Sequence, residues 1–233
     1  MKSFFSIAAI TSLTILCNAC TSNEIGESKD VAQDKIFQSY TVRYNEGDPT
    51  AEVYSQFRFA GRNGTTLILS KPSQLQFDGE IIKVDSGDYS GAYYKLAKPA
   101  EGFYGSHSFV FTTTENKNYT NSFSFSSFKL VNVPASASKK QDLLLPFETT
   151  PLKGDDYIDL QTVNTDSSFS ISHNYADGNA IKIPAEYLKK QKGNTITLEA
   201  SITRKPALQQ ATPEGGSMVI EQRLKPVTIK LTD

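Results

Sequence analysis

Carboxylates form the clusters in this chain that come nearest to suiting a metal ion. Asp155 and Asp156 are adjacent, Asp159 follows closely, and further acidic groups lie within residues 85–88 and 177–179. A calcium site needs several oxygens from one loop, and none of these segments matches the twelve-residue calcium-binding loop. We therefore predict no metal and no cofactor, and interpret residues 155–159 as a solvated turn. An interdomain calcium site near Asp155 and Asp156 is the alternative.

Tyrosines form a second cluster, because Tyr93 and Tyr94 are adjacent and Tyr89 and Tyr104 lie nearby. Such amphipathic rings can present a platform to a sugar or to a partner protein at little entropic cost. Strand alternation would instead place one of Tyr93 and Tyr94 in the core and the other outside. The chain has no Trp, the larger ring usually favoured for stacking on sugars. We name Tyr93, Tyr94, Asp155 and Asp156 as a possible binding surface.

Catalytic motifs are missing around the two histidines, His107 and His173. Neither histidine accompanies a nucleophile motif such as Gly-x-Ser-x-Gly, and the paired-histidine spacings that bind zinc are absent. We expect both to be surface or strand-end side chains, and we predict that the protein is not an enzyme. A carboxylate-dependent hydrolase is the alternative, because a sequence does not reveal how far apart two carboxylates lie in the folded chain.

The two cysteines, Cys17 and Cys20, have the spacing of a redox or zinc motif. Their context differs from such a site, because Lys2 precedes an apolar stretch at residues 7–16 that ends near the small residue Ala19. This is the layout of a secretory signal peptide. At about ten residues the stretch is shorter than the ~20 that a transmembrane helix requires. We predict a signal peptide at residues 1–19.

The junction Leu16-Cys17-Asn18-Ala19-Cys20 resembles the lipobox of bacterial lipoproteins, although Cys17 stands where that family usually has Leu. The resemblance covers the first twenty residues only. It implies that Cys20 becomes the mature N-terminus and carries acyl chains that anchor it in membrane lipid. Thr21 replaces the Asp that often favours retention in the inner membrane of such proteins. We therefore expect a membrane-anchored protein of the cell envelope, in the outer membrane.

Residues 20–35 are polar and contain no aromatic side chain, which is the composition of a flexible tether. The formal net charge of the chain is −1, and basic and acidic residues balance in each half of the remainder. Neither half has the basic bias of a nucleic-acid-binding protein. Nucleic acid is therefore excluded as a partner.

Alternation of apolar and polar residues dominates the rest of the chain and predicts strands with one buried face. Val53, Phe57 and Phe59 share one face of such a segment, and Phe pairs repeat the pattern further on. Turn residues at 61–64 and 78–79 separate the runs. In the first half we predict strands at residues 37–43, 53–59, 65–69, 74–77, 81–84, 92–96, 108–112 and 119–131.

The second half begins after a small, polar, proline-marked stretch at residues 133–140. A short helical turn is predicted after Pro184, ahead of a long strand whose Ile196, Leu198, Ala200 and Ile202 must face the core. The predicted strands of this half are residues 157–163, 169–173, 180–183, 195–204, 218–224 and 227–231.

The fold class that follows is all-β, with two tandem β-sandwich domains at residues 36–134 and 141–233. Strand spacing resembles that of immunoglobulin-like sandwiches, although the Cys…Trp…Cys core of antibody domains is missing. Residues 208–217 form the longest predicted loop and are a candidate place for binding.

Anchor, tether and strand content together predict an envelope lipoprotein that acts as a non-enzymatic binding or adhesion module. Its partner would be an envelope protein or a surface glycan. Besides the hydrolase, a second alternative is a subunit of an envelope assembly or uptake complex, in which an exposed edge strand pairs with a neighbour.

Overall fold

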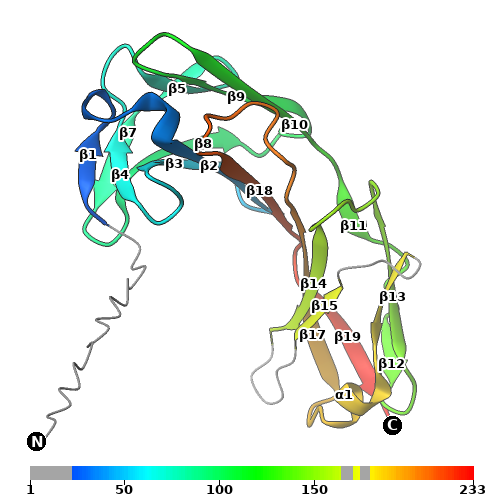
Figure 1. The fold of residues 1–233 in the computed structure, drawn as a ribbon. Helices are drawn as coiled ribbons and strands as arrows, with labels where there is room; N and C mark the ends of the chain where they lie inside the picture. Colours follow the sequence, from blue (N-terminus) through cyan, green and yellow to red (C-terminus); the bar gives the residue numbers. More distant parts are fainter. Residues whose placement is uncertain (1–22, 164–169, 174–178) are drawn as a thin grey trace, which may run out of the picture.

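Strands dominate the computed structural model, which describes residues 23–163, 170–173 and 179–233. They form two β-sandwich domains that together make an arch (Figure 1). The predicted all-β class with two tandem sandwiches is therefore confirmed. The predicted signal peptide and Cys20 lie outside the described residues. No helix of the described part combines the length and apolarity that crossing a bilayer demands.

One continuous sheet runs through both domains and follows the inner side of the arch (Figure 1). Its main path is β1-β4-β3-β2-β18-β17-β14-β15, with β7 and β8 attached to β3, and β12 and β19 attached to β17. Twelve of the described strands belong to it: β1 Ile25–Glu27, β2 Ile36–Asn45, β3 Thr50–Phe59, β4 Thr65–Ile68, β7 Val84–Gly87, β8 Gly91–Pro99, β12 Ser136–Ser138, β14 Tyr157–Thr162, β15 Ser170–His173, β17 Thr195–Arg204, β18 Gly216–Arg223 and β19 Val227–Thr232.

Two smaller sheets cover the large sheet, one in each domain. The first domain has the order β10-β9-β5-β6, made of β5 Gln74–Phe77, β6 Glu80–Ile82, β9 Gly105–Thr112 and β10 Asn118–Phe125. The second domain has the order β11-β13-β16, made of β11 Phe128–Leu130, β13 Leu143–Thr149 and β16 Ala180–Ile183. The single α-helix of the described residues is α1, Ala185–Lys189, which starts after Pro184 as predicted.

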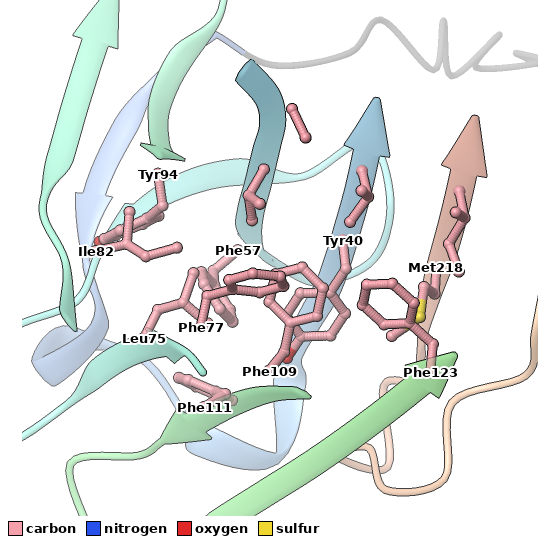
Figure 2. Close-up of a cluster of buried hydrophobic side chains, with 14 of the residues drawn as sticks. Tyr40, Phe57, Leu75, Phe77, Ile82, Tyr94, Phe109, Phe111, Phe123 and Met218 are labelled. Atoms are coloured by element: carbon pink, nitrogen blue, oxygen red, sulfur yellow. The ribbon is translucent and has the colours of Figure 1, made fainter. Parts of the chain in front are cut away.

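Aromatic rings fill the space between the two sheets of the first domain. Tyr40 stacks on Phe109 with 4.6 Å between ring centroids, and Phe57 packs against Phe111 at 4.5 Å. Figure 2 shows these rings between strands of the large sheet and strands of the four-stranded sheet. Such pairs add about 0.5–1.5 kcal/mol each beyond the burial of their area. We call this cluster the first core.

A separate aliphatic cluster, the second core, lies between the sheets of the second domain. It contains the four side chains predicted to face inward from the longest strand, Ile196, Leu198, Ala200 and Ile202, and all four are at most 3% exposed. Alternation therefore predicted the buried face of β17 correctly.

The boundary between the cores lies earlier than the predicted limits of 36–134 and 141–233. Phe125 packs in the first core, whereas Phe128 packs in the second. The predicted strand 119–131 is consequently broken into β10 and β11, which belong to different sheets. The physical reason is parity: residues three apart face opposite sides of a strand, so one unbroken strand could not bury both rings on one face.

Strand β18, from the second half of the chain, contributes to the sheet and the core of the first domain. β18 pairs in parallel with β2 along its whole length, which sets Met218 opposite Tyr40 and Ile220 opposite Val42. Both β18 side chains are buried in the first core. The end of β18 pairs with β17 as well, so this strand joins the two domains into one sheet.

The predicted flexible tether, residues 20–35, is corrected where the structure describes it. β1 pairs in parallel with β4, and two short 3-10 turns follow at Ser28–Asp30 and Gln33–Lys35. The hydroxyl of the buried Ser28 accepts a hydrogen bond of 2.8 Å from the Ser70 N–H. The polar residues that suggested disorder instead supply hydrogen-bond partners to backbone groups at and beyond the edge of β4.

Tight turns form where their residues predicted them. Asp78 and Gly79 join β5 to β6 with φ values of 49° and 80°, the conformation that Asp-Gly favours in hairpins. Gly61, with φ of 99°, begins the turn between β3 and β4. Hairpin connections are thus local properties of the sequence.

Candidate functional site

The predicted carboxylate pair lies at the junction of the two domains, where its two members have different surroundings. Asp156 is 7% exposed, and its Oδ2 accepts hydrogen bonds from the Arg204 guanidinium at 3.1 Å and from the Lys153 N–H at 3.0 Å. Its Oδ1 accepts one from the Lys205 N–H at 2.9 Å. The oxygens of Asp156 are therefore engaged by the protein itself, as in a structural clamp. The predicted solvated turn at residues 155–159 is thus wrong beyond Asp155, because Asp156 is buried and Asp159 belongs to β14.

Arg204 completes this clamp from the end of β17. Besides Asp156, its guanidinium donates to the Thr149 hydroxyl at 2.9 Å, and to the hydroxyl and carbonyl oxygens of Thr150, each at 2.8 Å. Within the described part of the chain, no group of three His, Cys, Asp or Glu side chains could hold a metal ion. The arrangement does not build the alternative calcium site, because Asp156 binds an arginine instead.

Asp155 is exposed and lies between two cavities. Both are also lined by Lys205, Pro206 and Ala207, which form a ridge between them. The edge cavity, about 650 Å³, opens beside β10 and includes Asp156 and Arg204 in its wall. The junction cavity, about 670 Å³, lies on the other side of the ridge. It lies over the face of the large sheet that is turned away from the cores, which we call the outer face of the sheet. Volumes of this size are typical of small-ligand sites.

The junction cavity is rich in positive charge. Arg58, Arg62 and Lys205 line it, and Asp155 is the one carboxylate among its described lining residues. The remaining wall is made of Phe37, Ser39, Gln56, Asn63, Pro206, Ala207, Leu208 and residues 216–219.

Arg58 is a buried cation, 7% exposed, on the outer row of β3. Its guanidinium donates hydrogen bonds to the Gly64 carbonyl at 2.8 Å and to the Gln56 Oε1 at 3.2 Å. Burial lowers the pKa of Arg58. Because an arginine in a protein is not deprotonated at physiological pH, the group retains its charge.

Arg62 and Lys205 differ from the other cations on this face. Among described residues neither forms an ion pair; each lies over an aromatic ring, Arg62 over Phe37 at 5.8 Å and Lys205 over Tyr157 at 5.0 Å. A cation over a ring face keeps its charge available to a ligand from the other side. Arg62 and Lys205 thus give the cavity two positive charges that form no ion pair within the described part of the chain.

The neighbouring part of the face is neutralised internally. Arg43 contacts Glu52 and Glu221, each at 3.0 Å, and Lys95 also pairs with Glu52. Partial burial raises the pKa of Glu52, but hydrogen bonds from Lys95 and Arg43 outweigh it, so the net pKa lies below the usual value. These charges stabilise one another and leave the excess at the junction cavity.

The predicted tyrosine pair is divided between the two faces of β8. Tyr94 is 3% exposed in the first core, and its hydroxyl accepts a hydrogen bond of 2.7 Å from the Leu69 N–H. Tyr93 lies on the outer face and donates to Asp85 Oδ2 at 3.0 Å. Strand alternation, not a two-ring platform, therefore describes Tyr93 and Tyr94.

The partner of Tyr93 is Tyr54, on the neighbouring strand β3. Their rings stack with 5.4 Å between centroids and 24° between planes, and both side chains are partly buried. Tyr54, Gln56 and Arg58 alternate along the outer face of β3, so the aromatic pair continues the wall of the junction cavity. Sequence reasoning missed this pair, whose only signal was the alternation that placed Tyr54 opposite to Val53 and Phe57.

His107 is not a surface side chain. Its ring stacks on Phe103 at 4.4 Å, its Nδ1 lies 2.7 Å from Asp78 Oδ2, and its Nε2 lies 2.6 Å from the Phe103 carbonyl oxygen. These contacts connect β9 to the β5–β6 turn and to the loop before β9, which is a structural role. His173 ends β15, as predicted from its position at the end of a strand.

The predicted binding loop at 208–217 is used inside the molecule. The side chains of Gln210 and Gln209 accept hydrogen bonds of 2.8 Å from the N–H groups of Thr120 and Ser122, on the free edge of β10. Thr212 donates to the Ile36 carbonyl at 2.6 Å. Residues 209–212 thus form a strap that covers an edge strand. The two ends of the predicted loop, Leu208 and residues 216–217, instead line the junction cavity, and residues 216–217 begin β18.

Comparisons with known proteins do not assign the chain to a family. No family model matches it, and neither does any curated protein. Among solved structures, the chain is similar to the two immunoglobulin domains of DIP-gamma, with 11% identity, 84% of this chain and 95% of that chain covered, and a TM-score of 0.22.

Two bacterial structures are similar at the same level. For Escherichia coli alpha-2-macroglobulin activated by porcine elastase the identity is 12%, the covered shares are 85% of this chain and 20% of that chain, and the TM-score is 0.25. The second is SGBP-B of the Bacteroides ovatus mixed-linkage glucan utilization locus, in complex with a mixed-linkage heptasaccharide. Its identity is 9%, the covered shares are 97% of this chain and 69% of that chain, and the TM-score is 0.20. Scores this low establish no relationship, so the description of this chain rests on its own geometry.

Proposed function

We propose that this protein is a non-enzymatic binding protein of the cell envelope, held to a membrane by lipid on Cys20, and that the junction cavity is its binding site. The observation that carries the proposal is the excess of positive charge among the described lining residues of the cavity: Arg58 is fixed on strand β3, and Arg62 and Lys205 lie in the turn after β3 and in the loop after β17. Strands hold side chains in place more firmly than loops do, and a rigid, preformed site is the kind that suits recognition.

The carboxylates near the cavities support binding over hydrolysis. Asp155 and Asp156 are neighbours in the sequence, and the Asp156 oxygens are occupied by Arg204 and two backbone N–H groups. A glycoside hydrolase instead needs two available carboxyl groups on opposite sides of the bond to be cleaved. The strap over β10 likewise gives that edge an internal partner, which weighs against strand pairing with another subunit there.

The anchor is tested with Cys20→Ala in a lipidating bacterium. We expect the wild type to gain acyl mass and to partition with membranes, while the variant stays unmodified and soluble. Intact mass and detergent phase partitioning are the measurements. If both proteins behave alike, the lipid anchor is wrong, whatever the junction cavity binds.

The binding site is tested separately by filling the junction cavity. Ser217 lies on the outer row of β18 and lines the cavity, so Ser217→Trp should block it. Ser201→Trp, on the outer row of β17, is the matched control outside the cavity. Full-length protein in detergent is assayed against immobilised glycans and isolated envelope proteins. Binding that survives Ser217→Trp but not Ser201→Trp would place the site elsewhere.

A further inference from the structure

We infer that the ligand of the junction cavity is an acidic polysaccharide, whose carboxylate or sulfate groups contact Arg58, Arg62 and Lys205. This inference rests on the proposed binding function and specifies the chemistry of its ligand.

Charge complementarity selects an anion. Three cations line the cavity against the single described carboxylate Asp155, although the whole chain has a net charge of −1. Arg58 is rigidly held by Gly64 and Gln56, whereas Arg62 and Lys205 stand at the rim over aromatic rings. A fixed cation below and two adaptable cations above can surround a planar carboxylate or a sulfate.

The backbone of the site argues against a peptide ligand. An extended peptide gains affinity by pairing with a free strand edge. Around the cavity β2 is paired with β3 and β18, and β3 is paired with β2, β4 and β8, so these strands are internal to the sheet. Over β2 and β3 a ligand therefore meets side chains and no free strand edge, which suits the hydroxyl groups and ring faces of sugars.

The outer row of β3 provides a path along which a chain of sugars can lie. Arg58, Gln56 and Tyr54 follow one another at about 7 Å intervals, twice the rise of an antiparallel strand. The stacked rings of Tyr54 and Tyr93 lie at the end of this row. A polymer could place an acidic unit over Arg58 and a neighbouring ring against the tyrosines, which explains why cavity and aromatic pair adjoin.

The test measures the affinity of the full-length protein, in detergent, for polygalacturonate, dextran sulfate, neutral dextran and poly-L-glutamate. We expect binding to at least one of the two acidic polysaccharides and at least about tenfold weaker binding to dextran and poly-L-glutamate. Polygalacturonate and dextran sulfate distinguish a carboxylate from a sulfate as the preferred group. The affinity should also fall as sodium chloride rises from about 0.05 M to about 0.5 M, because salt screens exposed charges.

The variants reverse the two rim charges together, Arg62→Glu with Lys205→Glu. The matched control is Lys189→Glu with Lys192→Glu, exposed residues near α1 in the second domain, which gives the same change in net charge. We expect roughly a hundredfold loss of acidic-polysaccharide binding in the first variant and little loss in the control. Tyr93→Ala should weaken binding roughly three- to tenfold, and Tyr89→Ala, at an exposed tyrosine that neither lines the cavity nor stacks on another described ring, should not. Circular dichroism verifies that each variant is folded.

Other outcomes separate this inference from the proposed function. Equal affinity for dextran and the acidic polysaccharides, or equal losses in the rim and control variants, would overturn the acidic ligand. If binding to a neutral glycan or an envelope protein is still lost in Ser217→Trp, the binding function stands without it. Stronger binding to poly-L-glutamate than to either polysaccharide would replace the glycan with an acidic polypeptide.

Discussion

The Asp156 Oδ2 lies 3.1 Å from an Arg204 guanidinium nitrogen, and this ion pair joins residues 48 positions apart where the two domains meet. Their side chains are only 8% and 15% exposed. When an ion pair is this well shielded from water, removing one partner leaves the other as an uncompensated buried charge. It connects the end of β17 to the loop before β14, beside the two cavities.

Asp156→Asn should therefore lower the free energy of unfolding by about 3 kcal/mol, because the guanidinium loses its only charged partner among the described residues. Urea denaturation at neutral pH measures the change. Asp155→Asn is the control, because the neighbouring side chain is exposed and should change stability by less than about 0.5 kcal/mol. Equal effects of the two substitutions would contradict the structural role of the clamp.

The buried hydroxyl of Tyr94 makes stability depend on alkaline pH. Burial raises the pKa of Tyr94 to about 12, whereas an unfolded tyrosine has a pKa of about 10. Below pH 10 both states are protonated and stability is unaffected. Between about 10 and 12 the unfolded chain loses its proton first, so stability falls with rising pH, by roughly 2–3 kcal/mol in all.

Tyr94→Phe tests this dependence. The variant should be less stable by about 1–3 kcal/mol at neutral pH, because the Leu69 N–H loses its acceptor, and its stability should fall less steeply above pH 10. Some slope will remain, because burial also raises the pKa of Tyr40. Urea denaturation between about pH 8 and about pH 11 gives both quantities; parallel curves for the two proteins would refute the assignment.

Ser55 offers a stabilising substitution. Its hydroxyl is fully buried in the first core and has no hydrogen-bond partner among the described residues. Ser55→Ala removes an unsatisfied polar group with little change of shape, so the free energy of unfolding should rise by about 1 kcal/mol. Ser106→Ala, at an exposed position of β9, should leave it nearly unchanged. A destabilised Ser55→Ala variant would show that the hydroxyl has a partner in solution.

The strap over β10 should protect the protein from self-association. Replacing both Gln209 and Gln210 with Ala frees the N–H groups of Thr120 and Ser122 on an edge strand, which another chain can then pair with. We expect concentration-dependent dimers or larger species in analytical ultracentrifugation. Gln210→Glu alone keeps the oxygen that accepts from Thr120 and leaves in place Gln209, whose Nε2 donates to the Ser122 carbonyl, so this variant should remain monomeric if the wild type does. Identical sedimentation of all three proteins would argue against this role.

Local features of this fold were readable from the sequence because each depends on a few neighbouring residues. Asp78-Gly79 supplies the positive φ angles that its tight hairpin turn requires. Ile196 to Ile202 alternate with polar residues, so any structure that buries one of them on a strand buries all four. The same rule divided Tyr93 from Tyr94. The all-β class with two sandwiches follows from many such local preferences acting together.

Tertiary structure alone decided the features that depend on distant residues. β18 could have continued the second domain, but Met218 and Ile220 gain a partner surface on β2, which lies almost 180 positions earlier. That crossing forms the continuous sheet and brings residues 37–63 beside Lys205. The junction cavity, whose wall includes residues of β2, β3 and β18, results from it. The stack of Tyr54 on Tyr93 and the Asp156–Arg204 pair also join residues that are far apart in the sequence, but each forms within one domain. No local pattern encodes these contacts, because their energy comes from surfaces that meet only after the chain has folded.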